Sequence, residues 1–226
     1  MKFLVPLILT AFILTSCQSN GSGSLVDTLN VSEQSVAQSG SSSFISPDEQ
    51  SYASLQPRVQ KTYLINGLAS AVPFIGYGFT NLSKKIEGGR LFSYISPVEG
   101  SLQAAPAVMK DILAAHAQNP DVEINLIGIS YGANLVSRIA IKLHRKNIPV
   151  HYLGTIEGTH LKRIPPNVRT ADNFTCTFLD CTRATARLAR GNQITQLNSY
   201  KFKSSHIPLG DNREMHNRVL RQIAAR

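Results

Sequence analysis

The stretch that decides the fold is Val122-Glu123-Ile124-Asn125-Leu126-Ile127-Gly128-Ile129-Ser130-Tyr131-Gly132-Ala133. Its apolar first half, rich in β-branched residues, predicts a buried strand. After it, apolar residues return at helical spacing, at Leu135, Val136, Ile139, Ala140 and Leu143. Ser130 is therefore predicted on a sharp turn between a strand and a helix. The flanking glycines suit such a turn, because a β-carbon there would collide with the neighbouring backbone.

This position gives Ser130 a chemical context that the five-residue motif alone would not supply. The amino end of the following helix points free N–H groups at the place where an oxyanion would form. A serine hydroxyl is a poor nucleophile at neutral pH, so it needs a histidine to accept its proton and an acid to orient that histidine. Candidates for both lie downstream of Ser130.

His206 is the predicted base, because it follows the last predicted strand and precedes the last predicted helix. The other downstream histidines fit less well: His144 and His216 lie inside predicted helices, His151 in a strand and His160 in a loop that would have to fold back. For the acid, Glu157 at the carboxyl end of a strand is favoured over Asp180, and Asp172 and Asp211 are further alternatives. The choice between Glu157 and Asp180 stays open at this point.

From residue 61 onward, short β-branched runs alternate with stretches of helical period, which is typical of an α/β domain with a parallel sheet. Strands are predicted at 61–65, 91–95, 122–127 and 150–156, with weaker ones at about 173–178 and 194–202. Helices are predicted at about 77–86, 102–117, 131–146 and from 212 onward. The segment is long enough for a core but leaves no room for a large cap domain.

Together these features resemble the α/β-hydrolase superfamily, in particular its small bacterial lipase-like and thioesterase-like members. The resemblance covers residues 61–224 and rests on Leu64-Ile65-Asn66-Gly67-Leu68, on the motif around Ser130 and on the segment around His206. It implies a minimal α/β-hydrolase: a mostly parallel sheet of five to six strands with helices on both faces. It also implies an oxyanion hole made by the backbone N–H groups of Leu68 and Tyr131. Members of the group often have Asp-Pro where this chain has Glu157-Gly158.

The resemblance implies a serine hydrolase that cleaves an ester or thioester through an acyl-enzyme, with Ser130, His206 and Glu157 as its triad. No metal and no organic cofactor are expected. The apolar segment 69–77 is expected to border the acyl pocket. Two alternatives remain: a non-catalytic binding or scaffold lipoprotein on the same fold, and an envelope acyltransferase that uses the same residues.

The amino terminus has the pattern of a bacterial lipoprotein. Residues 1–16 combine Lys2 with an uncharged apolar stretch, as in a signal peptide, and Leu14-Thr15-Ser16-Cys17 resembles a lipobox in which Cys17 receives the lipid. Residues 17–58 are rich in Ser and Gly and are predicted to form a flexible tether. The expected location is the cell envelope at the periplasmic face, and Gln18 favours the outer membrane over the inner one.

The predicted hydrolase domain, residues 59–226, holds 21 basic and 10 acidic residues, a net charge of +11. The chain has neither zinc-finger spacing nor a dense lysine run, so this charge does not indicate a nucleic-acid partner. Gly-rich nucleotide-binding motifs are lacking as well. Cys176 and Cys181 remain after lipidation of Cys17, and in an oxidising compartment we expect them to form a disulfide.

Overall fold

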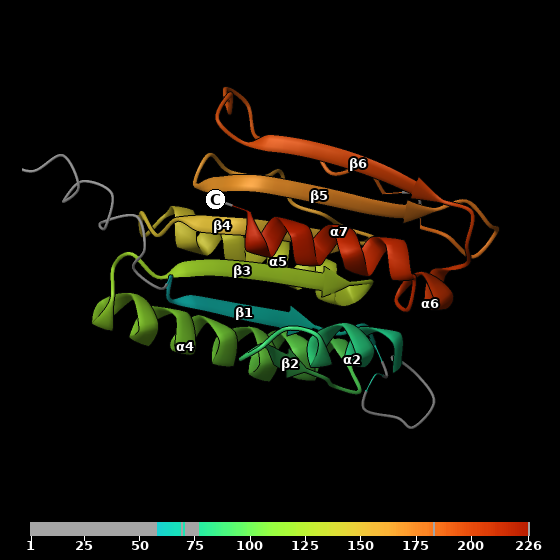
Figure 1. Cartoon of the computed structure of the whole chain (residues 1–226), viewed down its shortest axis with the longest axis horizontal. Coiled ribbons are helices and arrows are strands. Elements are labelled where there is room, and N and C mark those ends of the chain that lie inside the picture. Colours follow the sequence, from blue (N-terminus) through green and yellow to red (C-terminus); the bar gives the residue numbers. More distant parts are fainter. Residues whose placement is uncertain (1–57, 69, 71–76, 183, 226) are drawn as a thin grey trace, which may run out of the picture. The chain divides into compact units, whose positions relative to one another are not determined.

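A computed structural model describes residues 58–68, 70, 77–182 and 184–225, which form one parallel sheet with helices on both sides (Figure 1). The strand order is β2-β1-β3-β4-β5-β6, and every neighbouring pair is parallel. The strands are β1 (Gln60–Ile65), β2 (Arg90–Phe92), β3 (Glu123–Ile129), β4 (Val150–Ile156), β5 (Val168–Cys176) and β6 (Gln196–Phe202). All strands therefore end at the same edge of the sheet, where Figure 1 shows their arrowheads.

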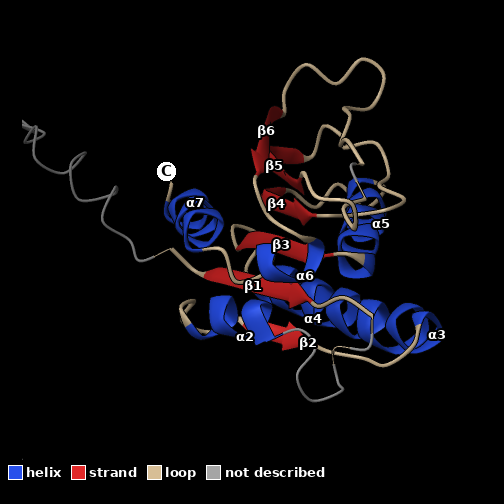
Figure 2. Ribbon diagram, turned by 90° about the vertical axis from the view of Figure 1, so that its right-hand side faces the viewer, coloured by secondary structure: helices blue, strands red, loops and turns tan. Residues whose placement is uncertain are grey.

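Helices cover both faces of the sheet, as predicted. They are α2 (Tyr77–Lys84), α3 (Pro97–Glu99), the π-helical turn η2 (Gly100–Ala104), α4 (Ala105–Gln118), α5 (Tyr131–His144), α6 (His206–Leu209) and α7 (Arg213–Ala224). Figure 2 looks at the carboxyl edge of the strands and shows α4 and α5 on one face and α2 and α7 on the other. Within the described ranges, no additional domain covers this edge.

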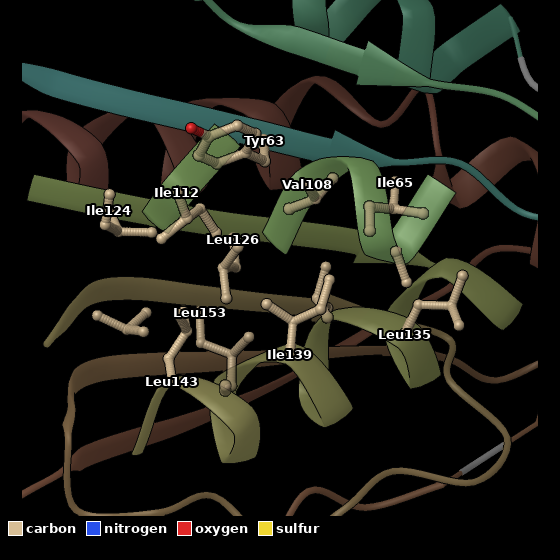
Figure 3. Packing of buried hydrophobic residues seen from close by; sticks show 14 of the residues in the cluster. Tyr63, Ile65, Val108, Ile112, Ile124, Leu126, Leu135, Ile139, Leu143 and Leu153 are labelled. Atoms are coloured by element: carbon tan, nitrogen blue, oxygen red, sulfur yellow. The ribbon is translucent and has the colours of Figure 1, made fainter. Parts of the chain in front are cut away.

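Two apolar clusters, one on each face, hold these layers together. Residues of β1 and β3 alternate between them: Tyr63 and Leu126 face α4 and α5 (Figure 3), whereas Leu64 and Ile127 face α2 and α7. A parallel sheet that is covered on both faces buries nearly every strand residue, which explains why β3 and β4 are buried along almost their whole length rather than at every second position.

The boundaries differ from the predictions in three places. β5 begins at Val168 and ends at Cys176, whereas this strand was predicted at about 173–178. Its first half includes Arg169 and Thr170, so it lacks the apolar run that would have revealed it. β2 is only three residues long, and the helix expected at 102–117 begins as the π-helical turn η2 before α4 continues to Gln118.

Several predictions fall on residues that the structure does not describe. They are the signal peptide, Cys17, the tether up to residue 57 and most of the apolar segment 69–77. Among the described helices, none has both the length and the apolar character needed to cross a membrane.

Candidate active site

Ser130 lies on the turn between β3 and α5, in a backbone conformation that non-glycine residues rarely adopt. Its φ is 56° and its ψ is −122°, and its N–H donates to the carbonyl of Ile156 at 2.7 Å. A β-carbon on Gly128 would run into the backbone of Gly132, and a β-carbon on Gly132 would run into the carbonyl oxygens of Ile65 and Asn66. The two glycines of the motif are thus required by close backbone packing around the serine.

Two backbone segments reach Ser130 from either side. Tyr131 is the first residue of α5, so its N–H has no acceptor within the helix. The loop after β1 passes so close that a β-carbon on Gly67 would lie 3.2 Å from Ser130 Cβ. Asn66 Oδ1 accepts the N–H of Gly67 at 3.0 Å and fixes this loop. The predicted oxyanion donors, Leu68 and Tyr131, therefore follow directly on Gly67 and Ser130, the two residues in closest approach.

His206 is the first residue of α6, and its imidazole lines the same hollow as Ser130. Its Nδ1 lies 3.3 Å from Glu157 Oε2. Within the described part of the chain, the imidazole makes no hydrogen bond to Ser130 Oγ; such bonds are often long in enzymes without substrate. The ring thus has one nitrogen on the acid, which leaves Nε2 as the atom that could accept a proton.

Glu157 follows β4 directly and is fully buried. Its Oε1 accepts the N–H of Cys176 at 2.8 Å, and its Oε2 accepts the N–H of Thr182 at 2.6 Å. A buried carboxylate is costly unless such donors surround it, and charge-assisted bonds of this kind are short and strong. The backbone of Glu157 is left-handed, with φ at 48°. The sequence did not indicate this left-handed backbone, which occurs together with a glutamate where related hydrolases often have the shorter aspartate.

The structure does not bring the other three candidate acids to the imidazole in the same way. Asp180 Oδ2 accepts the backbone N–H of His206 at 2.9 Å. Asp172 is buried in the sheet, where it accepts hydrogen bonds from Tyr152 and Asn198, and burial raises the pKa of its carboxyl. Asp211 accepts a hydrogen bond from Asn81. The geometry therefore favours Glu157 as the group that orients His206.

A hollow of about 180 Å³ lies between Ser130 and His206. Glycine and apolar side chains form most of its wall, and its lining residues are Asn66, Gly67, Leu68, Ser70, Phe79, Ile129, Ser130, His206, Ile207 and Gly210. A wider hollow of about 440 Å³ opens at the opposite edge of the sheet, around Glu123 and His151, and contains none of the candidate site residues. We assign the smaller one to the site, because it holds the strained serine.

The predicted disulfide is present between Cys176 and Cys181. With Glu157, these two sulfurs form the one group of potential metal ligands found in the described ranges. Sulfurs joined in a disulfide are not thiolates, so this group does not make a metal site.

Two residues that were not predicted from the sequence also hold the site together. Asn134, buried on α5, accepts the N–H groups of Thr159 and His160 at 3.0 and 2.8 Å and ties the loop after Glu157 to the serine's helix. Its position among apolar helix residues was the available signal. Thr182 acts through its backbone N–H, for which the sequence carries no signal.

Neither a protein-family model nor a curated protein sequence matches this chain. Solved structures do match. The thioesterase domain SrfTE, which cyclizes the lipopeptide antibiotic surfactin, aligns at a TM-score of 0.50 and 12% identity over 75% of this chain and 93% of that one. A cutinase-like protein from Cryptococcus sp. (TM-score 0.43, 13% identity, 73% and 95% coverage) and the thioesterase RedJ from Streptomyces coelicolor (0.42, 12%, 74% and 89%) align less well. The parallel six-stranded sheet, with no large cap among the described residues, together with the match to SrfTE, is a minimal α/β-hydrolase fold.

Proposed function

We propose that this protein is a serine hydrolase that cleaves an ester or thioester through an acyl-enzyme. The observation that carries the proposal is the placement of Ser130, which stands on a strained turn at the amino end of α5 and shares a hollow with His206. His206 in turn lies against a buried carboxylate. Strain at a single polar residue of this kind concentrates at functional sites.

In the proposed reaction, Ser130 Oγ attacks the acyl carbonyl carbon while His206 Nε2 accepts the hydroxyl proton. The carbonyl oxygen becomes an oxyanion that the N–H groups of Leu68 and Tyr131 stabilise. His206 then gives its proton to the leaving alcohol or thiol, and an ester to Ser130 remains. Water, deprotonated by His206, attacks this ester, and His206 returns the proton to Ser130 Oγ as the acid leaves. Glu157 accepts the Nδ1–H throughout and stabilises the imidazolium.

The hollow supports an acyl or aromatic substrate of small size. Its volume of about 180 Å³ is near the roughly 150 Å³ of an engineered apolar cavity that binds benzene. Leu68 and Ile207, which line it, are also 41% and 63% exposed, so they offer apolar surface at its mouth. We infer a short acyl group over a long one.

The test is reaction of the full chain with a fluorophosphonate, followed by intact-mass spectrometry. We expect one adduct on the parent, none on Ser130→Ala or His206→Ala, and an unchanged adduct on His160→Ala, which removes an exposed histidine. Esters of increasing acyl length then report on the pocket. A folded parent without an adduct would overturn the proposal and favour the binding-protein alternative, and an acceptor-dependent product with little hydrolysis would indicate acyl transfer.

Anchoring of this hydrolase in the cell envelope through lipidated Cys17 belongs to the same proposal. The supporting observations are the signal-peptide pattern of residues 1–16 and the lipobox-like Leu14-Thr15-Ser16-Cys17. Two or three acyl chains on one residue are enough to hold a protein on a bilayer.

A further inference from the structure

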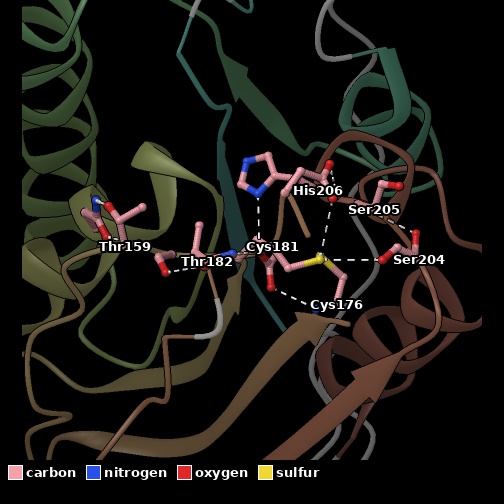
Figure 4. Close-up of polar contacts among 11 residues, drawn as sticks. Thr159, Cys176, Cys181, Thr182, Ser204, Ser205 and His206 are labelled. Atoms are coloured by element: carbon pink, nitrogen blue, oxygen red, sulfur yellow. Dashed lines mark hydrogen bonds and ion pairs between the residues drawn. A yellow bond between two sulfur atoms is a disulfide. The ribbon is translucent and has the colours of Figure 1, made fainter. Parts of the chain in front are cut away.

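The segment from Cys176 to Thr182 contacts both the acid and the histidine of the candidate site. It begins at the last residue of β5, and the disulfide from Cys176 to Cys181 closes it into a short ring (Figure 4). We call residues 176–182 the disulfide loop. Its contacts divide into a group on the Glu157 side and a group on the His206 side.

On the Glu157 side, the two ends of the disulfide loop each hold one carboxylate oxygen. The N–H of Cys176 donates to Oε1 at 2.8 Å, and the N–H of Thr182 donates to Oε2 at 2.6 Å. Thr182 Oγ1 also donates to the carbonyl of Gly158 at 2.8 Å, next to Glu157 in the chain. The side chain and the backbone of the acid are therefore fixed by the same short segment.

On the His206 side, Asp180 Oδ2 accepts the backbone N–H of His206 at 2.9 Å. The N–H of Phe178 donates to the carbonyl of Ser204 at 3.3 Å, and Cys181 Sγ lies 3.5 Å from the same oxygen. The disulfide loop therefore also contacts the segment between β6 and α6, which determines the position of the His206 backbone.

Cys176 and Cys181 pack against the apolar cluster on the α2 and α7 face, but residues 177–180 between them are exposed, so apolar burial does little to hold the middle of the loop in place. Leu179 is 98% exposed and Phe178 is 46% exposed. Ordering this exposed middle part costs conformational entropy that little burial offsets. The covalent ring lowers that cost, because it already restricts the conformations of the unfolded loop.

Resting on the proposed function, we propose that the disulfide loop is a positioning device for the Glu157–His206 pair. Asp180 and the disulfide act as positioning groups, without touching the substrate. A dithiol that reduces the disulfide gives two electrons and two protons to the cysteines and itself becomes a disulfide. The freed loop no longer fixes the distance between acid and imidazole, so proton transfer slows while acyl binding in the hollow is retained.

The experiment measures kcat and KM of the full chain on a short-chain nitrophenyl ester. The variants are Asp180→Ala, Asp180→Asn and Cys176→Ser/Cys181→Ser, and Leu179→Ala is a matched control in the same loop. We expect kcat to fall between about 10-fold and 100-fold in Asp180→Ala and in the cysteine variant, with KM within about twofold. Asp180→Asn, which keeps an acceptor oxygen, should recover most of the loss. Dithiothreitol should slow the parent and leave the cysteine variant unchanged.

Folding and function are controlled separately. Near-ultraviolet circular dichroism establishes that each variant is folded. Proton NMR detects the Nδ1–H of His206, and its resonance should broaden when the disulfide is reduced or removed. Folded variants with parental kcat, or a loss confined to KM, would overturn the positioning role and leave the hydrolase proposal intact. A parent that neither turns over esters nor reacts with a fluorophosphonate would overturn both.

Discussion

The turn at Ser130 requires a residue without a β-carbon at Gly132. A β-carbon there would overlap the carbonyl oxygens of Ile65, at the buried end of β1, and of Asn66, which follows it, and this packed backbone cannot move aside. We expect Gly132→Ala to lower the free energy of unfolding by about 3 kcal/mol, at the upper end of the cost of overpacking. Urea unfolding checks this. Gly191→Ala is the control: its φ is 77° with nothing near the new atom, so only about 1 kcal/mol of left-handed strain is expected. Equal losses in the two variants would contradict the steric explanation.

His216 is a second residue whose environment gives a measurable signature. It is fully buried on α7, with Nε2 2.8 Å from the carbonyl of Gly210 and Nδ1 3.0 Å from Lys85 Nζ. Burial lowers the pKa of this imidazole and the positive charge of Lys85 lowers it further, although the carbonyl of Gly210 opposes the shift. The native state therefore holds a neutral ring that accepts from Lys85.

The pH dependence follows from this lowered pKa. The unfolded chain protonates His216 near pH 6.5, whereas the native chain binds that proton only at lower pH. The contribution of His216 to the stability of the native state should thus be constant above pH 7. It should fall as the pH drops below 6.5, by up to about 1.4 kcal/mol per pH unit. Urea unfolding between pH 7.5 and 5 should show a flatter decline for His216→Gln than for the parent. Parallel declines in the two proteins would refute the assignment.

At the scale of elements, the stability of α7 on the sheet depends on the residue that caps its amino end. Asn212 caps the helix by accepting the N–H of Met215 at 3.0 Å, and Met215 and Val219 are buried below it. Replacing Asn212 by Ala should cost about 1 kcal/mol, because a backbone donor loses its partner, whereas Asn212→Ser should cost less than half of this. Thermal unfolding of the two variants measures the difference. A Ser variant as unstable as the Ala variant would show that the cap is not the cause.

The sequence was informative wherever one segment determines one element. The run through β3, Ser130 and α5 has a buried strand, a motif and an amphipathic helix in order, and all three lie where they were predicted. β5 was placed too late, since Arg169 and Thr170 interrupt its apolar pattern while neighbouring strands supply the burial. Asp180 appeared only as an alternative acid. Its bond to the His206 backbone joins residues 26 positions apart, which no local pattern encodes.

At the scale of the whole molecule, the proposed anchor predicts how the protein distributes in the cell. The full chain should be found in the membrane fraction, whereas Cys17→Ser should lose the acyl mass and shift to the aqueous fraction, because about 0.8 kcal/mol per buried methylene is removed. Detergent phase partition and intact-mass spectrometry measure both effects. Ser16→Ala is a suitable control, since it keeps a small residue at the expected signal-peptide cleavage site. Membrane retention of unmodified Cys17→Ser would overturn the anchor.

The strand pairings of the sheet also determine how the chain reaches its native state. No neighbouring pair is a hairpin: the shortest separation between paired residues is 18 positions, from Val150 to Val168, and the pairing of Gln60 with Glu123 spans 63. Each pairing must close a long loop before it gains any contact energy, and chains dominated by such distant contacts fold slowly. The parallel arrangement places Ser130, Glu157 and His206 at one edge of the sheet. As a consequence, the newly synthesised chain should stay unfolded for longer than an antiparallel meander of the same size would.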